Sequence, residues 1–361
     1  MAYGTVNADV IGTSVANSNL GAGNATRFKN RIINGDMRID QRNAGASGTA
    51  TGYTVDRWQY IASQASKATW QQNAGSVTPP SGFINYLGFT SSSAYSVVSG
   101  DYFAVQQPIE GLNLSDLGWG TVNAKTVTVS AWVYSSLTGT FGGVVCNSGS
   151  SRSYPFTYSI PVANTWTQIS VTIAGDTTGT WLKTNGIGAI VIFGLGVGTT
   201  YSGSAGSWAG ANYISATGAT SVVGTSGATF YITGVQLEVG SSATGFDLRD
   251  FGTEMLLCQR YFEKSYNYEV KPGTASSVSP IVNFPTQYVV QFFACYKVPK
   301  RTDATMTYYS ALTGAAGYYT YNYTNDAIVN AVSTGQTSAS CYAVTPGNVS
   351  AYVHFTASAE L

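Results

Sequence analysis

Charge is scarce in this sequence. Only 9% of its 361 residues are Asp, Glu, Lys or Arg, whereas about a quarter is usual in soluble domains. The 17 basic and 17 acidic residues give a formal net charge of zero, which argues against a nucleic-acid partner and against an anionic membrane surface. Short strands with Ser, Thr, Asn and Gly on their outer faces, together with burial of surface in an oligomer, would keep such a chain in solution.

Long apolar runs are also missing. No segment approaches the roughly 20 apolar residues that cross a bilayer, and the start "MAYGTVNADVIGTS" has neither the basic nor the apolar region of a signal peptide. We therefore expect no membrane insertion and assembly in a cytoplasm. The cysteines form no CxxC pair, so they predict buried free thiols and neither a zinc site nor a redox motif. They are Cys146, Cys258, Cys295 and Cys341.

Residues for catalysis are few. The one histidine, His354, lies in the strand-like "SAYVHFTASAEL", which argues against a Ser-His or Cys-His pair. "GLGVG" at 194–198 is followed by no Lys-Ser or Lys-Thr, so it is no phosphate loop. Glycoside hydrolysis needs two carboxyl groups about 5 to 9.5 Å apart, and no pair is distinguished among the available acids. Those acids are Asp101, Glu110, Asp116 and Asp176. We therefore expect that the protein is not an enzyme.

Strand patterns dominate what is present. "KTVTVSAWVYSS" places four apolar residues of 127–133 on one face, and "WTQISVTIAG" does the same with Ile169, Val171 and Ile173. This period of two is typical of half-buried strands. "IGAIVIFGLGVG" is apolar on both faces and predicts a central strand of a sandwich.

The order of the segments predicts a mainly β protein. Residues 1–26 are expected to be a short attachment arm, 27–265 a β-sandwich that ends in a helix, and 266–361 a smaller β domain. The helix is predicted within 247–265, because Asp250 and Thr253 are suitable caps and apolar residues follow at spacings of three and four.

The few charges are concentrated at both ends of the predicted sandwich. Residues 27–42 and 247–264 hold seven charges each, whereas 121–236 hold four. We expect the two charged segments to lie side by side and their ions to pair as an architectural clamp. The neutral stretch between them predicts a surface for permanent contacts, as in a homotrimer.

Aromatic residues in loops are the candidates for sugar binding, because ring faces stack on the C–H faces of pyranoses. The first set is flanked by Gly, Ser and Asn: Trp119, Trp181, Tyr201, Trp208 and Tyr213. The second alternates in the C-terminal domain: Tyr319, Tyr321 and Tyr323. Packing at a trimer axis stays open as an alternative for both sets. Three other tryptophans lie within strands and are expected to be core or half-buried: Trp58, Trp132 and Trp166.

Several motifs together resemble bacteriophage tail fibre and related virion appendage proteins. They include "RFKNRIINGDMRIDQRNAG", "YTVDRW", and "QLEVG" followed by "CQRYFEK" at 258–264. The resemblance is good over residues 27–265 and looser over 266–361. It implies a jelly-roll domain of the carbohydrate-binding-module type in a structural virion protein.

The resemblance also implies partners and a location. It implies a homotrimer on the virion, attached to other phage structural proteins through the N-terminal arm and binding a host-surface glycan. A short tail fibre or tail-tip protein is the first expectation; a head fibre or capsid decoration protein and a polysaccharide depolymerase are the alternatives. Modules of this type often hold a structural calcium, for which Asp36 and Glu238 are the candidate ligands. An ion pair of either acid with Arg31 or Arg249 is the simpler alternative.

Overall fold

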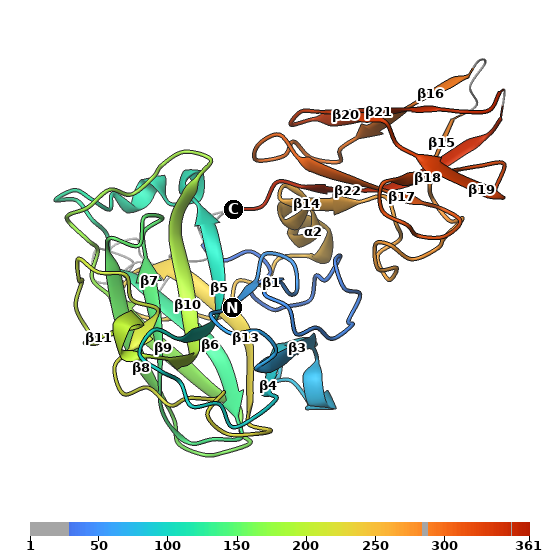
Figure 1. Ribbon diagram of the computed structural model, residues 1–361. Coiled ribbons are helices and arrows are strands. Elements are labelled where there is room, and N and C mark those ends of the chain that lie inside the picture. The colour runs from blue at the N-terminus through green and yellow to red at the C-terminus, as the bar shows by residue number, and fades with distance from the viewer. Residues whose placement is uncertain (1–28, 284–287, 348) are drawn as a thin grey trace, which may run out of the picture.

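The computed structural model describes residues 29–283, 288–347 and 349–361. They form two β bodies joined at a short helix (Figure 1). The arm predicted for residues 1–26 lies outside the described residues.

The larger body is a sandwich of two antiparallel sheets. One has six strands in the order β1(Gly52–Tyr53), β2(Gln59–Ala62), β5(Tyr102–Glu110), β10(Ile187–Val197), β7(Gly139–Cys146), β8(Ser153–Ile160). The other has five, in the order β3(Ala68–Gln72), β4(Leu87–Ser91), β13(Thr229–Val239), β6(Val127–Ser135), β9(Thr167–Ile173). Two short parallel strands and four 3-10 turns complete it: β11(Ser202–Gly203), β12(Ser215–Ala216), η1(Ala74–Ser76), η2(Gly111–Asn113), η3(Ser115–Leu117), η4(Thr199–Tyr201).

The core lies between these two sheets and follows the predicted alternation. Val129, Val133 and Ile173 are fully buried from the side of the five-stranded sheet, which confirms the inward faces of β6 and β9. Strand β10 pairs with β5 on one side and β7 on the other, so the segment that is apolar on both faces is a central strand. Trp58 is also fully buried, as expected.

The predicted helix is α2, Phe251–Gln259. The Asp250 side chain caps it by accepting a hydrogen bond from the Thr253 backbone N–H. It is shorter than the predicted segment, because the chain pairs as strand β14, Phe262–Lys264, with β22 of the C-terminal body. Within the described residues, no helix is both long and apolar enough to cross a bilayer.

The smaller body also has two layers of strands. One sheet contains β14, β22(Ala351–Ser358), β18(Tyr318–Tyr321), β19(Asn325–Ile328), β15(Ile281–Asn283) and β17(Thr305–Ser310). The other contains β16(Val289–Cys295), β21(Ser338–Val344) and β20(Ala331–Thr334). The expected class, a jelly-roll β-sandwich followed by one short helix and a smaller β domain, is confirmed. The expected boundary at residue 265 falls directly after β14.

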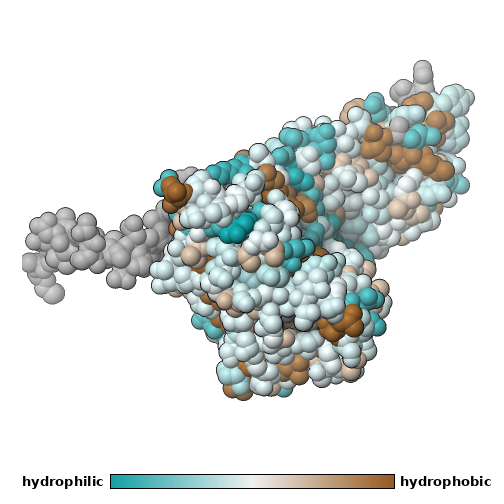
Figure 2. Space-filling view, turned by 60° about the vertical axis from the view of Figure 1, so that its left-hand side comes forward, coloured by the Kyte–Doolittle hydropathy of each residue, from teal (hydrophilic) through white to brown (hydrophobic). Residues whose placement is uncertain are grey.

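An apolar face of the smaller body is open to solvent. Figure 2 shows hydrophobic side chains gathered on this body, while most of the surface is pale. Four outward residues of β16 and β21 are large and mainly apolar, each 45 to 59% exposed: Val289, Phe293, Tyr342 and Val344. Gln291, Cys295 and Ser338 share this face, so the expectation of a buried thiol is wrong for Cys295.

The two charged segments lie side by side, as the sequence predicts. Lys29 Nζ donates to the Gly245 carbonyl at 2.7 Å, and the Arg249 guanidinium donates to the carbonyl of Asn30. Direct ion pairing between the segments was also expected. The ion pairs instead form within one segment, as for Arg38–Asp36 and Arg249–Glu254, or with acids elsewhere, as for Arg31–Asp116. The segment 29–42 contains no regular strand, so its buried carbonyls and amides need side-chain partners.

Candidate functional site

The outer face of strand β6 carries the side chains of the candidate site. Because side chains alternate along a strand, burial of the valines on one face turns Ser130, Trp132 and Tyr134 outward. On the neighbouring strand β9, Gln168 lies directly opposite Trp132 and Ser170 opposite Ser130. Rings, an amide and hydroxyls therefore share one surface.

A bulge in β13 forms the floor beside these residues. The register against β6 shifts between Thr233 and Gln236, and Gly234 within it has φ 60°. A Cβ atom on Gly234 would lie 2.6 Å from Phe83 Cζ and 3.2 Å from Trp132 Cδ1. Glycine is required here for its left-handed backbone and for the space between two rings.

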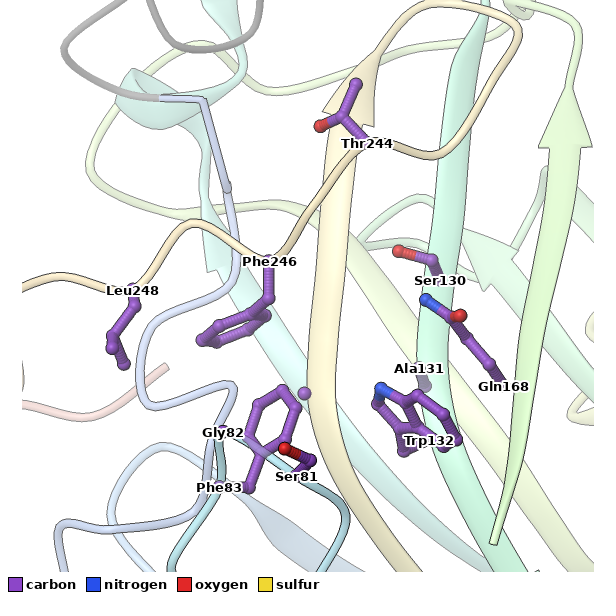
Figure 3. Close-up of a pocket in the computed structure, with 11 residues that line it drawn as sticks. Ser81, Gly82, Phe83, Ser130, Ala131, Trp132, Gln168, Thr244, Phe246 and Leu248 are labelled. Atoms are coloured by element: carbon purple, nitrogen blue, oxygen red, sulfur yellow. The ribbon is translucent and has the colours of Figure 1, made fainter. Parts of the chain in front are cut away.

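A pocket of about 300 Å³ opens over this floor. Phe83 and Phe246 stand on one side of β13, with ring centroids 5.2 Å apart and planes at 63°, while Trp132 and Gln168 stand on the other (Figure 3). Phe83, Trp132 and Phe246 are half-buried, so each ring keeps accessible surface.

The pocket is lined by the apolar faces of aromatic rings and by uncharged polar side chains. Ser130, Gln168 and Thr244 supply hydroxyls and an amide, and none of the eleven lining residues is charged. Aromatic faces pack on apolar C–H groups, and amides and hydroxyls exchange hydrogen bonds with other hydroxyls. This combination fits an uncharged ligand that is apolar on its faces and polar at its edge, as a pyranose is.

The acids near the pocket are already bonded. Glu238 accepts hydrogen bonds from the Thr244 backbone N–H at 2.8 Å and hydroxyl at 2.7 Å, and it lies 3.9 Å from Lys29 Nζ. Asp247 lies 3.6 Å from Arg249. These contacts hold the loop that brings Phe246 to the pocket.

The residues do not fit the structural calcium considered for Asp36 and Glu238. Asp36 is in a loop, paired with Arg38 at 3.0 Å, whereas Glu238 is bonded as above. The cations expected to pair with them are engaged elsewhere: Arg31 with Asp116 at 2.8 Å, and Arg249 with Glu254 at 3.1 Å. In the described parts of the chain, no three or more His, Cys, Asp or Glu residues gather as metal ligands would.

The three loop tryptophans predicted to contact sugar pack against one another. The ring centroids of Trp119 and Trp181 are 4.6 Å apart, and Trp208 lies 5.6 and 5.4 Å from them. Trp119 is 3% exposed and Trp181 8%. The expectation of accessible rings is wrong for these two, because the glycine-rich loops that carry them fold back over one end of the sandwich core. Trp208 is half-buried on top of them.

Tyr201 and Tyr213 lie on the outer face of the other sheet. Both are half-buried and pack on a cluster that includes Ile190 and Ile192 of β10. The segment 198–216, which carries both tyrosines, therefore covers much of this face with the chain's own residues.

The tyrosines of the C-terminal domain do not form an outward stripe. Tyr319 is fully buried and donates its hydroxyl to the Val344 carbonyl at 2.7 Å. Tyr321 packs on the same core. Tyr323 is exposed in a turn and lies against Tyr352, with centroids 3.6 Å apart. The expectation that these rings form an outward stripe is wrong for Tyr319 and Tyr321, because the face of β18 that carries them lies between the two layers of strands.

The four candidate catalytic acids have structural partners. Burial raises the pKa of Glu110, but hydrogen bonds from Arg260 and Tyr261 outweigh it and hold the pKa below its usual range. Asp176 is likewise held below its usual pKa, with Arg152 overcoming burial. The backbone N–H of Val98 and other donors lower the pKa of Asp101, and Asp116 pairs with Arg31. A general acid needs a raised pKa.

The one histidine has a structural position. His354 is fully buried in β22, with Nδ1 3.0 Å from the Ser265 hydroxyl and Nε2 2.9 Å from the Ser276 carbonyl oxygen. Burial lowers its pKa. Its predicted place in a strand is confirmed.

The sequence analysis missed the residues that meet at the pocket. The outward alternation of Ser130, Trp132 and Tyr134 is visible in "VTVSAWVYSS" and was a usable signal. Phe83 and Phe246 lie far apart in sequence without periodicity, and the Phe83 ring packs over Gly234, where a side chain would collide with it.

No protein family model matches this chain, and no curated protein matches it in sequence. Several solved structures are similar over part of it. The enzymatically active domain of tailspike protein 4 of bacteriophage CBA120 is 12% identical, over 58% of this chain and 21% of that one, with a TM-score of 0.33.

Two carbohydrate-binding modules are also similar. One, in complex with β-1,4-galactotriose, is 10% identical over 59% of this chain and 99% of its own, with a TM-score of 0.30. The family 11 module from Clostridium thermocellum, in complex with a β-1,3-1,4-mixed-linked tetrasaccharide, is 10% identical over 54% of this chain and 96% of its own, with a TM-score of 0.27. At these scores the similarities decide nothing about what this chain binds.

Proposed function

We propose that this chain is a structural protein of a bacteriophage virion, a short tail fibre or tail-tip component whose sandwich binds a host-surface glycan. The observation that carries the glycan part is the pocket in which Phe83, Trp132 and Phe246 surround the bulge at Gly234. Three rings with an amide and hydroxyls fit the faces and edges of a sugar.

The virion part of the proposal rests on the sequence motifs that resemble phage appendage proteins. It includes a homotrimer, which the exposed apolar face of β16 and β21 supports, because such a face is suited to burial in an assembly. It also includes a role in binding and not in catalysis. The ion-paired states of Glu110 and Asp176 support that role.

Glycan binding is tested with the full chain and fluorescently labelled host cells. Phe83→Ala and Trp132→Ala are expected to abolish cell binding that competing host polysaccharide also blocks. Tyr213→Ala is the control, because it removes a half-buried ring on the other sheet. Loss of binding in the control, with the pocket variants unaffected, would refute the assignment of the pocket.

Location and activity need separate measurements. Gold-labelled antibody on intact particles is expected to mark the tail; labelling of the head would favour a head fibre or decoration protein, and no labelling would refute the virion role. Release of reducing ends from host polysaccharide would instead favour the depolymerase. Light scattering is expected to give three times the chain mass.

A further inference from the structure

The pocket belongs to a series of three rows on the outward face of β6 and β9. Each row consists of an outward residue of β6 and its neighbour on the β9 side. Trp132 lies opposite Gln168 and Ser130 opposite Ser170. The Tyr134 ring contacts that of Trp166, the residue that precedes β9. Successive outward residues of a strand are ~6.8 Å apart. The face therefore presents ring contacts, then the pocket, then hydroxyls, in line along β6.

The row beyond the pocket is aromatic. Tyr134 stacks on Tyr231 of β13, with ring centroids 5.1 Å apart and planes at 8°, and lies 5.4 Å from the ring of Trp166. Tyr134 and Trp166 are only half-buried. This packing, together with the hydrogen bond that Trp166 Nε1 donates to the Thr78 carbonyl at 2.9 Å, fixes the two rings while part of their surface stays accessible.

The row on the other side begins at Ser130, a buried residue of the pocket lining, and ends at the Ser170 hydroxyl. Ser170 is exposed and faces the same way as Ser130. Strands β6 and β9 contain no charged residue over their whole lengths. The nearby acid Glu238 is bonded to Thr244 and Lys29, so the three rows offer a ligand neither a free cation nor a free carboxylate.

We propose that this face binds an uncharged saccharide chain lengthwise along β6 and β9, with one ring in the pocket at Trp132 and neighbouring rings over the rows of Tyr134 and Ser170. The inference rests on the proposed glycan binding and specifies its ligand class. A ring held at Trp132 cannot also reach rows ~6.8 Å to either side, so an internal stretch of chain, and not a single terminal sugar, fills the face.

The test is an array of oligosaccharides probed with the full chain. The array carries gluco-, galacto- and chito-oligosaccharides from mono- to hexasaccharide, together with oligogalacturonides of the same lengths. We expect binding to neutral chains only, with affinity rising at least about tenfold from mono- to hexasaccharide. Ser170→Arg, which blocks one row with an exposed side chain, is expected to remove that rise.

A matched control and a second variant sharpen the test. Ser159→Arg places the same side chain at an exposed serine of β8, an edge strand of the other sheet, and is expected to bind as wild type. Tyr134→Ala is expected to reduce binding of long chains as Ser170→Arg does; if this variant does not fold, Ser170→Arg alone decides.

Each outcome has one meaning. Equal affinity for mono- and hexasaccharides, an unaffected Ser170→Arg variant, or equal binding of oligogalacturonides would overturn the inference and leave glycan binding standing. Failure of wild-type protein to bind any saccharide would overturn the proposed glycan binding, and the inference with it.

Discussion

Arg57 and Glu360 form an ion pair across the joint between the two bodies, although 303 positions separate them in the chain. The Arg57 side chain is 1% exposed and that of Glu360 7%. The other carboxylate oxygen of Glu360 accepts from Arg42 at 2.7 Å, and the Arg57 guanidinium lies 3.7 Å from the centroid of the Tyr261 ring. One carboxylate therefore pairs with two guanidinium groups at the joint.

Removing this carboxylate is expected to destabilise the protein. Glu360→Gln leaves Arg57 buried without a counter-charge, and breaking a buried pair in this way costs about 3–5 kcal/mol. Thermal and urea unfolding measure the loss. Asp116→Asn is the control, because Asp116 is 46% exposed and exposed pairs contribute ~0–1 kcal/mol. Equal losses in both variants would contradict a special role for Glu360.

Substitution of the glycine in the floor of the pocket, compared with a matched glycine elsewhere, separates an effect on glycan affinity from an effect on stability. Gly234→Ala forces a side chain into a left-handed backbone, which costs ~1–2 kcal/mol, and sets its Cβ against Phe83. We expect a lower melting temperature together with loss of glycan affinity. Gly218→Ala is the matched control: its φ is +78° and nothing lies within 4 Å of the added Cβ. It should lose stability alone, and equal loss of affinity in both variants would refute the pocket.

The buried tryptophan cluster is expected to support the fold without binding sugar. Trp181→Ala empties a core position between Trp119 and Trp208, and such a truncation costs about 3–5 kcal/mol. Affinity for glycan, measured by titration on the fraction that stays folded, should equal that of wild type. A selective loss of affinity with unchanged melting temperature would restore the reading of Trp181 as a sugar contact.

Asp56 is expected to make stability depend on pH. Burial raises its pKa to about 7, even though Arg42 and a hydrogen bond from Gln41 act in the opposite direction. Since the native state then holds the proton more tightly than the unfolded chain, this contribution is complete below about pH 4 and is lost as the pH rises through about 7.

Asp56→Asn removes that dependence. The variant should gain stability relative to wild type between pH 5 and pH 8, measured as the difference in urea midpoint. Asp176→Asn supplies the opposite sign, because Arg152 holds the pKa of Asp176 low. The contribution of Asp176 is complete above the unfolded value of about 4 and is lost as the pH falls through its lower native pKa. A constant difference between wild type and Asp56→Asn across the range would show that Asp56 does not titrate there.

Much of the fold was predictable because burial leaves a local signature. The alternation of valines around Ala131 identifies the inner face of β6, and the doubly apolar run at 187–197 identifies a central strand. The approach of the charged segments was predictable too, because the two ends of a sandwich often lie side by side. The expected pairing of their ions was not, since contacts such as that of Arg249 with the Asn30 carbonyl go to backbone.

The site was not predictable, because it depends on how distant loops fold. Glycine and threonine around Trp181 correctly indicate a loop, but they carry no information about whether the loop folds back on the core. Phe83 meets Trp132 only because β13 bulges at Gly234, and the position of a bulge follows from the pairing of three strands. Local patterns specify which face a residue takes within a strand, and tertiary packing decides the rest.

The chain enters and leaves the smaller body through neighbouring strands. Phe262 of β14 lies opposite Ser358 of β22, and directly afterwards the Ala359 backbone N–H donates to the Tyr261 carbonyl. Topologically this body is thus an insertion between the helix and the residues that return to Arg57 (Figure 1). The two ends of this body are therefore one strand spacing apart, as in domains that tolerate insertion into another chain.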